Sequence, residues 1–509
     1  MRTVVPKRST GGCLTCKKRR KKCDERRPYC NRCETGDFHC LGYSPPATEY
    51  TGGPDITGTG LIHRTSHTPS VKQSELRDSN LKSLDALIPL PGHEDQVGQL
   101  ILAHTHFREL KSCQDNIPRE ITLDQIPLED ITSLIVSQYT RFSREVLFKE
   151  AAFSVEGLLR RIDRSGVARW SMYLSARVVV DLLNGINVQK YLGWVFRFCQ
   201  QITDASTSSD LVPNLGGQLD GLYDLVSLGS MLSGTATGYS LLRRCTSVFL
   251  RLAASEPHIW VDDSQISVPD AFRGSRFEVA QFIIYDVISS LALGTPSLLP
   301  YDTTSWTTTF RSHYLEWIYG FPVEIFIYLV QINARRTAWM IGGTAGDTEG
   351  CHEIEKHLRN WDPVADHTEG SSKIIARLAV QEAWRQAALV YLYMGMGGVN
   401  SADPRIETAV RQVVQLGRTI ETGSSFELHL MVPSLVAGVA ARWEKHRAAL
   451  RSKVACGLLR KVNPQVLPIR GSDFIAVLDH LWHGAGSDGN PVTWEDYVGS
   501  RCAVLPVTH

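Results

Sequence analysis

The sequence predicts two unlike parts, a small metal-stapled N-terminal module and a large, mostly α-helical domain. Six of the 12 cysteines fall between residues 13 and 40, where Tyr29 and Phe38 are the only Phe, Tyr or Trp residues. The segment that follows is rich in Gly, Pro, Ser and Thr, and from about residue 94 apolar residues recur at helical spacing. We therefore expect domains over 1–46 and 94–509, joined by a flexible linker over 47–93.

The charge of the chain is divided unevenly between these parts. The 509 residues carry a net charge of +1, but residues 1–40 hold 12 Lys or Arg against 4 Asp or Glu. The remaining residues hold 42 Lys or Arg against 49 Asp or Glu, so a head of charge +8 precedes a body of charge −7. This asymmetry predicts a polyanion as the partner of the head.

The sequence shows no sign of secretion or of a membrane span. The first residues, MRTVVPKRSTGG, lack the apolar segment of a secretory signal, and no stretch reaches 18 apolar residues. We expect the six cysteines outside the head to be small buried hydrophobic residues in a reducing compartment. They are Cys113, Cys199, Cys245, Cys351, Cys456 and Cys502.

The cysteines of the head repeat the unit C-x2-C-x6-C with an offset of 17 residues: Cys13, Cys16 and Cys23, then Cys30, Cys33 and Cys40. A segment this short cannot bury a core and normally needs a metal or disulfides. Each C-x2-C pair can place two thiolates on one zinc ion at about 2.3 Å. Three disulfides are the alternative, but thiols of the nucleus or cytosol stay reduced.

Two tetrahedral zinc ions would need eight thiolate ligands, and the head has six cysteines. Two cysteines must then bridge both ions, one from each half by symmetry. His39 is a competing ligand, but it adjoins Cys40, and two adjacent side chains can hardly reach one ion. The spacing therefore predicts a metal cluster.

This spacing, the basic run before Cys23, the Asp after it and the Pro near Cys30 resemble the fungal binuclear zinc-cluster transcription factors. All six cysteines match. The resemblance implies two zinc ions per chain, bridged by Cys13 and Cys30, and a short helix after each C-x2-C. It also implies that the first helix enters the major groove of double-stranded DNA and reads a CGG-type triplet.

The resemblance also assigns roles to the cationic side chains of the run. Arg19 and Arg20 match positions that contact base edges, and a guanidinium suits O6 and N7 of guanine. At the position of Arg20 the family commonly has lysine. Lys17 and Lys22 match positions that bind phosphate and set the register on DNA.

The other cations of the head are given smaller roles. Lys18 and Lys21 occupy variable positions of the family, and we interpret them as solvated charge. The second half has the acidic loop ETGDFH where the first has its basic run, so it is predicted to be structural, with Arg32 as a phosphate contact. The run KKRRKK is also typical of a nuclear localisation signal, and one stretch can serve both import and DNA binding.

Helices are predicted wherever apolar residues recur at the spacing of one helix face. The clearest segments are 321–336, with Pro322 near its start, and 372–394, which runs into a Gly-rich stop. Similar periodicity recurs at 133–162, 172–184, 237–254, 275–293 and 404–420. The leucines at 81, 84 and 87 are too few for a coiled coil.

The helical region resembles the regulatory domain of the same family, best over 276–302 and 313–336. This likeness implies activation or repression through partners or a bound metabolite.

In CHEIEKH (351–357), His352 and His357 are five residues apart and do not share a helix face as zinc-protease ligands do, so we expect a polar helix surface. TWEDY (493–497) is interpreted either as a coactivator contact or as domain packing.

Together these features predict a nuclear, zinc-dependent, sequence-specific DNA-binding regulator of RNA polymerase II transcription. We do not expect an enzyme, since no acid, base or nucleophile set converges in the body. An interaction scaffold would leave the six cations between the cysteines unexplained. The expected partners are double-stranded DNA and the transcription machinery or co-regulators, with no membrane. A monomer and a homodimer through the helical domain both fit the sequence.

Overall fold

The computed structural model describes residues 11–13, 16–17, 21–26, 30–35, 128–207, 214–262, 264–307, 314–340, 348–363, 370–456 and 465–507. The chain separates into two compact units, 1–91 and 92–509. The predicted boundaries at 46 and 93 and the leucine-spaced segment at 81–87 lie outside the described residues, so the boundaries stay predictions.

In the first unit, helical structure occurs at each C-x2-C pair. Cys16 and Lys17 are helical, and the amide of Lys17 donates to the carbonyl oxygen of Cys13 at 3.0 Å. At the second pair, α2 (Asn31–Thr35) contains Cys33. The predicted fold class, a small cysteine-rich module followed by a mostly helical domain, is confirmed.

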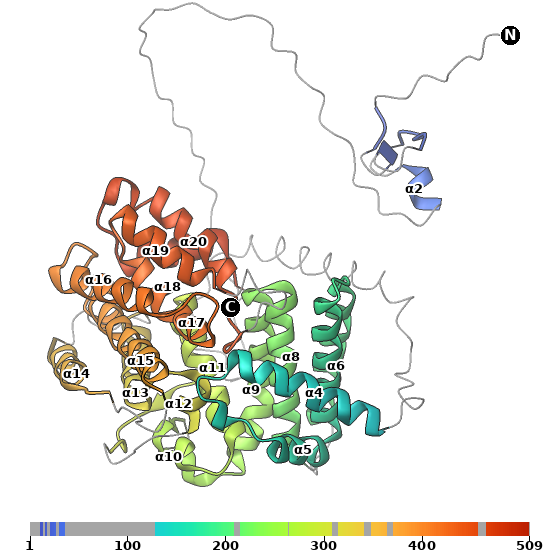
Figure 1. Ribbon diagram of the computed structural model, residues 1–509, viewed down its shortest axis with the longest axis horizontal. Helices are drawn as coiled ribbons and strands as arrows, with labels where there is room; N and C mark the ends of the chain where they lie inside the picture. Colours follow the sequence, from blue (N-terminus) through green and yellow to red (C-terminus); the bar gives the residue numbers. More distant parts are fainter. Residues whose placement is uncertain are drawn as a thin grey trace, which may run out of the picture. The chain divides into compact units, whose positions relative to one another are not determined.

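The described part of the second unit is mostly helical (Figure 1). The α-helices are α4 (Leu128–Val146), α5 (Val155–Arg164), α6 (Gly166–Leu183), α7 (Leu192–Thr207), α8 (Leu215–Ser233), α9 (Thr235–Ala254), α10 (Val268–Arg273), α11 (Phe277–Leu293), α12 (Tyr314–Tyr319), α13 (Val323–Met340), α14 (Thr348–Asn360), α15 (Ser371–Tyr391), α16 (Pro404–Thr419), α17 (Ser425–His429), α18 (Met431–Val439), α19 (Glu444–Val454), α20 (Gly471–His483) and α21 (Trp494–Val504).

Short elements join these helices. A π-helical turn, η6 (Leu392–Met396), continues α15, and the 3-10 turns are η3 (Glu150–Ala152), η4 (Gln189–Tyr191), η5 (Pro257–Ile259) and η7 (Ser487–Gly489). β1 (Ile266–Ser267) and β2 (Tyr301–Asp302) pair in parallel, with Ile266 opposite Tyr301. Among the described residues, none of the helices combines the length and hydropathy that a membrane crossing requires.

The predicted periodic segments coincide with α6, α9, α11, α13, α15 and α16. The segment 133–162 holds two helices, because α4 ends at Val146 and α5 begins only at Val155. Ser154 then caps α5, its hydroxyl accepting from the amide of Gly157 at 3.2 Å. The helix α14 exposes His352 and His357 and buries Ile354 and Leu358, which confirms the predicted polar surface.

The helix α8 was not predicted, because its sequence is rich in glycine. These glycines bring its backbone close to neighbouring helices. A Cβ at Gly217 would lie 2.4 Å from the Cβ of Ser165, and one at Gly221 would lie 2.8 Å from Cγ1 of Val167 on α6. A glycine inside a helix costs about 1 kcal/mol relative to alanine, and close packing offsets that cost here.

The core surrounds α11, which contacts α8, α9, α10, α13 and α18. Phe282 of α11 stacks on Phe249 of α9 with ring centroids 4.1 Å apart, and both side chains are fully buried. Cys199 and Cys245 are buried as predicted, Cys351 and Cys456 are only partly buried, and Cys502 is exposed, so the prediction was wrong for Cys502. Cys113 lies outside the described residues. Cys502 lies on α21, on the side that faces away from the core.

A buried carboxylate holds the loop that follows α11. Asp286 is fully buried, and its carboxylate accepts from the amide of Leu298 at 2.8 Å, the amide of Leu299 at 3.3 Å and the hydroxyl of Tyr301 at 2.7 Å. Burial raises the pKa of Asp286 to about 7, although these donors oppose the shift. Both Asp286 and Tyr301 belong to the segment 276–302 that resembled the family.

We expect Asp286→Asn to change how stability depends on pH. The folded pKa of about 7 lies above the ordinary value of 3.8, so the contribution of this carboxyl is full below pH 4 and is lost as pH rises through 7. Compared with the variant, the wild type should therefore lose stability between pH 4 and 7, by at most about 4 kcal/mol. Urea unfolding at pH 5 and pH 8 measures this difference. Parallel pH profiles for the two proteins would contradict the assignment.

Candidate metal centre and DNA interface

Five of the six predicted zinc ligands lie in the described part of the first unit and form one buried cluster. The Sγ atom of Cys13 lies 3.5 Å from that of Cys30 and 3.8 Å from that of Cys33. The Sγ atom of Cys16 lies 3.7 Å and 3.8 Å from the same two atoms. The thiols of Cys13, Cys16, Cys23 and Cys30 all lie within 4.8 Å of one another.

These sulfur–sulfur distances fit zinc ligands. Four thiolates placed tetrahedrally at about 2.3 Å from a zinc ion lie about 3.8 Å from one another. A disulfide requires about 2.05 Å, which is far shorter than the 3.5 Å of the closest pair, and none of the five described cysteines forms a disulfide. The donor set therefore suits a metal cluster and not the disulfide alternative. Cys40 lies outside the described residues.

The two halves of the cluster hold their sulfur atoms in the same way. The amide of Cys16 donates to Sγ of Cys13 at 3.3 Å, and the amide of Cys33 donates to Sγ of Cys30 at 3.3 Å. These bonds are related by the 17-residue offset of the sequence repeat. Amides that point at sulfur stabilise the thiolate form, which is the form that binds metal.

Cys23 is held by amides from both of its sides. The amides of Cys13 and Glu25 each donate to its Sγ atom at 3.4 Å. Burial, in contrast, raises the pKa of the Cys16 and Cys30 thiols when no cation is bound. A zinc ion supplies the positive charge that a buried group of thiolates needs.

Asp24 joins the two halves of the module. One carboxylate oxygen accepts from the amide of Arg32 at 3.0 Å, and the other accepts from the amide of Asn31 at 2.8 Å. These amides begin α2, so Asp24 caps that helix from seven or eight residues away, and they lower the pKa of the Asp24 carboxyl. The sequence showed an Asp after Cys23 as part of the resemblance but gave no reason for it.

The described cations lie around this buried cluster. Lys17, Lys21 and Lys22 are exposed, and the amide of Lys21 donates to the carbonyl oxygen of Cys16 at 3.0 Å. Arg19 and Arg20, the predicted base-reading residues, lie outside the described residues, as does Lys18. Arg32 is exposed on α2.

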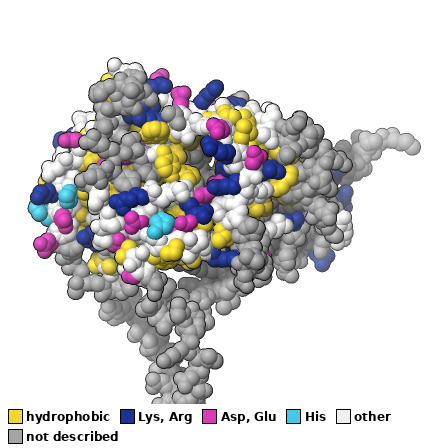
Figure 2. Space-filling model, turned by 90° about the horizontal axis from the view of Figure 1, so that it is seen from below, with side chains coloured by type: hydrophobic (Ala, Val, Ile, Leu, Met, Phe, Trp, Pro, Cys, Tyr) yellow, Lys and Arg dark blue, Asp and Glu magenta, His cyan; other side chains and the backbone are white. Residues whose placement is uncertain are grey.

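The second unit has a different surface. On the face drawn in Figure 2, Lys and Arg side chains are interspersed with Asp, Glu and hydrophobic side chains. Of the TWEDY stretch, Trp494 and Tyr497 are buried, and Glu495 pairs with Arg336 at 2.6 Å. The two aromatic side chains of this stretch therefore serve domain packing. Among the described residues, the head provides the group of side chains that could hold a metal ion.

Comparison with protein families agrees with this division of the chain. Residues 11–50 match the fungal Zn(2)-Cys(6) binuclear cluster domain, and residues 222–504 match the fungal specific transcription factor domain. The second match covers more than half of the 509 residues. The chain belongs to this family of fungal transcription factors. Its cluster domain binds two zinc ions, and its members are regulators of transcription and not enzymes, which confirms both predictions.

Individual relatives match mainly over short segments. The chain is 55% identical to white-opaque regulator 2 of Candida albicans over 42 residues, which is 8% of this chain and 9% of that protein. It is 39% identical to the aspercryptin biosynthesis cluster-specific transcription regulator of Emericella nidulans over 74 residues, covering 14% of this chain and 12% of the relative. Arginine metabolism regulation protein II of Saccharomyces cerevisiae is 31% identical over 100 residues, or 18% and 11% of the two chains.

These matches therefore span roughly a tenth of each relative's length. No solved structure shows a significant match to the chain.

We expect Asp24→Ala to make the metal centre less resistant to a chelator. The change removes the cap of α2 and the link between the halves, so zinc transfer to a chromogenic chelator should become several-fold faster. Asp24→Asn keeps one acceptor oxygen and should give an intermediate rate. Equal rates for wild type and both variants would show that this link does not support the cluster.

Proposed function

We propose that this chain is a zinc-dependent, sequence-specific DNA-binding regulator of RNA polymerase II genes that acts in the nucleus. The observation that carries the proposal is the cluster of buried thiols with exposed lysines around it, in a chain of this family. A metal-bound frame of this kind holds cations in fixed positions, where a polyanion can neutralise them.

In this proposal the six cysteines of the head are the ligands of the two zinc ions, with Cys40 completing the set by the family pattern. Cys13 and Cys30 bridge both ions. Their sulfur atoms lie 3.5 Å apart, and each also lies within 4.8 Å of the Sγ atom of Cys23. A bridging thiolate must lie close to the ligands of both ions, a condition that Cys13, Cys30 and also Cys16 meet. The choice of Cys13 and Cys30 follows the family pattern.

The basic run contacts DNA through two kinds of interaction. Lys17 and Lys22 bind phosphates, which is consistent with their exposure beside the cluster. Arg19 and Arg20 read base edges of a CGG-like triplet in the major groove. The zinc-bound module stays cationic, since six thiolates and two zinc ions carry only −2 against a head of +8.

The helical unit then regulates transcription through the transcription machinery or co-regulators. Its surface mixes both signs of charge on the face shown, which suits protein partners better than a nucleic-acid backbone (Figure 2). Analytical ultracentrifugation of the full chain distinguishes a monomer from a homodimer through this unit.

Cys30→Ala should abolish binding of both zinc ions, because a bridging ligand serves both. Cys502→Ala, at an exposed cysteine on α21, should keep two ions and is the matched control. Native mass spectrometry of the full chain measures the zinc content. Retention of one zinc by the Cys30 variant would show that Cys30 is a ligand of a single ion.

Selection from random DNA duplexes should enrich CGG-like sites for the wild type. Arg20→Ala should relax base preference and cost about 1–3 kcal/mol on the selected site. Lys17→Ala should weaken binding to all sequences alike and lower the slope of log K against log salt by about 1. Lys21→Ala, an exposed lysine at a variable position, is the control. A uniform loss over all sequences for the Arg20 variant would contradict its role in base reading.

A further inference from the structure

The helices that precede the matched family domain have a hydrophobic cluster of their own. Ile131 and Ile135 of α4, Leu158 and Ile162 of α5 and Met172 of α6 form it, separately from the main core. The helix α6 takes part in both, since Val178 belongs to the main core. The helices α4 and α5 therefore pack on α6 through a small apolar patch.

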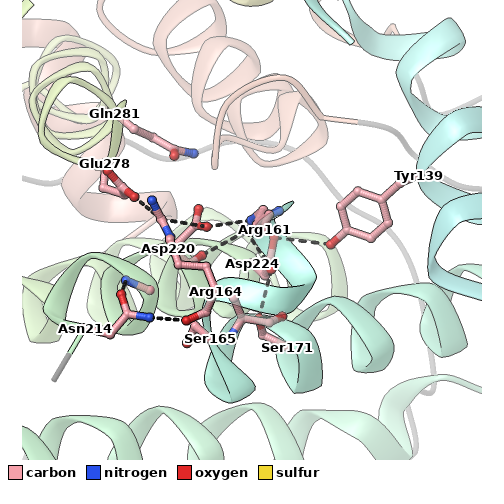
Figure 3. A network of polar contacts seen from close by, with 12 residues as sticks. Tyr139, Arg161, Arg164, Ser165, Ser171, Asn214, Asp220, Asp224, Glu278 and Gln281 are labelled. Carbon is pink, nitrogen blue, oxygen red and sulfur yellow. Dashed lines mark hydrogen bonds and ion pairs between the residues drawn. The ribbon is translucent and has the colours of Figure 1, made fainter. Parts of the chain in front are cut away.

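Their side-chain contacts with α8 and α11 include a polar network, and Arg161 of α5 is central to it (Figure 3). Its Nε atom donates to Oδ2 of Asp220 at 2.7 Å, and its Nη2 atom donates to Oδ2 of Asp224 at 2.9 Å. The same Nη2 atom donates to the carbonyl oxygen of Asp220 at 3.1 Å. Both carboxylates belong to α8, so one guanidinium joins two turns of that helix to α5.

Other side chains extend this network to α4 and α11. The hydroxyl of Tyr139 on α4 donates to Oδ1 of Asp224 at 3.3 Å, and Arg164 of α5 pairs with Glu278 of α11. Ser171 of α6 donates to Asp224 at 2.9 Å. Figure 3 shows these groups converging from several helices on the two carboxylates of α8.

A second attachment lies between α4 and α5. Both ring nitrogens of His429 lie 2.9 Å from carbonyl oxygens, one of Val146 and one of Tyr319. The guanidinium of Arg377 donates to the carbonyl oxygen of Phe148 at 3.1 and 3.2 Å. The Phe148 ring is buried against the domain, so this attachment is partly apolar.

The network depends on charge compensation. Asp220 and Asp224 are four residues apart on α8, where like charges repel, and their side chains are only 8% and 14% exposed. Burial raises the pKa of Asp224, and the Arg161 guanidinium opposes this shift. Without Arg161, two buried carboxylates would face α5 with less compensation, which disfavours the packed arrangement.

We propose that α4 and α5 (128–164) form a strap that opens from the helical unit as one piece, and that Arg161 is the side chain that holds it closed. Opening uncovers Asp220, Asp224 and the surface of α6 around Met172, while the core around α11 stays folded. The strap comes before residue 222, where the matched family domain begins. This proposal rests on the fold and is independent of the proposed DNA contacts.

Hydrogen exchange of the full zinc-loaded chain, followed by mass spectrometry, tests the proposal. In Arg161→Met, protection of amides in 128–164 should fall on the order of 100-fold, while amides of α9, α11 and α15 keep their protection. Arg160→Met is the matched control, because Arg160 is 74% exposed and its ion pair among the described residues lies within α5, with Glu156 at 3.7 Å. It should change neither region.

The wild type provides a second measurement that does not depend on a variant. Amides in 128–164 should share one opening free energy that is lower than that of α11 and α15. Exchange of 128–164 only together with the core would overturn the proposal. So would an Arg161→Met profile that is unchanged in 128–164, or one that falls equally in the strap and in the core.

Discussion

The order of the N-terminal module depends on the bond between thiolate and zinc. Residues 13–40 contain almost no large apolar side chains, so burial of apolar surface cannot oppose the repulsion of the basic run. Metal ligation supplies folding free energy on the order of 10 kcal/mol in small zinc domains. The amides of Cys16 and Cys33 then fix the sulfur atoms, and Asp24 fixes α2 against the first half. The positions of the described lysines, Lys17, Lys21 and Lys22, follow from this frame.

The helical unit, in contrast, is stabilised mainly by burial of apolar side chains. Its core is extensive and apolar, and ionisable groups within it and at its edges hold backbone amides or other charges. Asp286 holds the loop after α11, and Glu316 accepts from the amide of Val323 at the start of α13 at 2.9 Å. Both carboxyls lie in the two segments that carried the likeness to the family's regulatory domain. In this chain, those two segments therefore hold polar groups that fix the loop after α11 and the start of α13.

The sequence predicted structure that depends on residues close together in the chain, but not contacts between residues far apart in it. The cysteine cluster follows from spacing within 28 residues, and α11 or α16 follows from apolar periodicity. The helix α8 was missed because glycine lowers helix propensity, and only its neighbours show why glycine is needed. Arg161 and its partners are separated by 59 and 63 residues, so no pattern in the sequence joins them. Asp24 was part of the motif that carried the resemblance. Its function as a cap could not be predicted, because it depends on how the backbone brings Asn31 and Arg32 to its carboxylate.

The glycines of α8 have a consequence for the order in which the helical unit folds. A segment that carries Gly216, Gly217, Gly221 and Gly229 forms few helical turns by itself. Its backbone becomes helical when α6 and α9 supply surfaces at close range, as the contacts of Gly217 and Gly229 require. We therefore expect the helix at the centre of the polar network to form late in folding, on the surfaces that α6 and α9 provide.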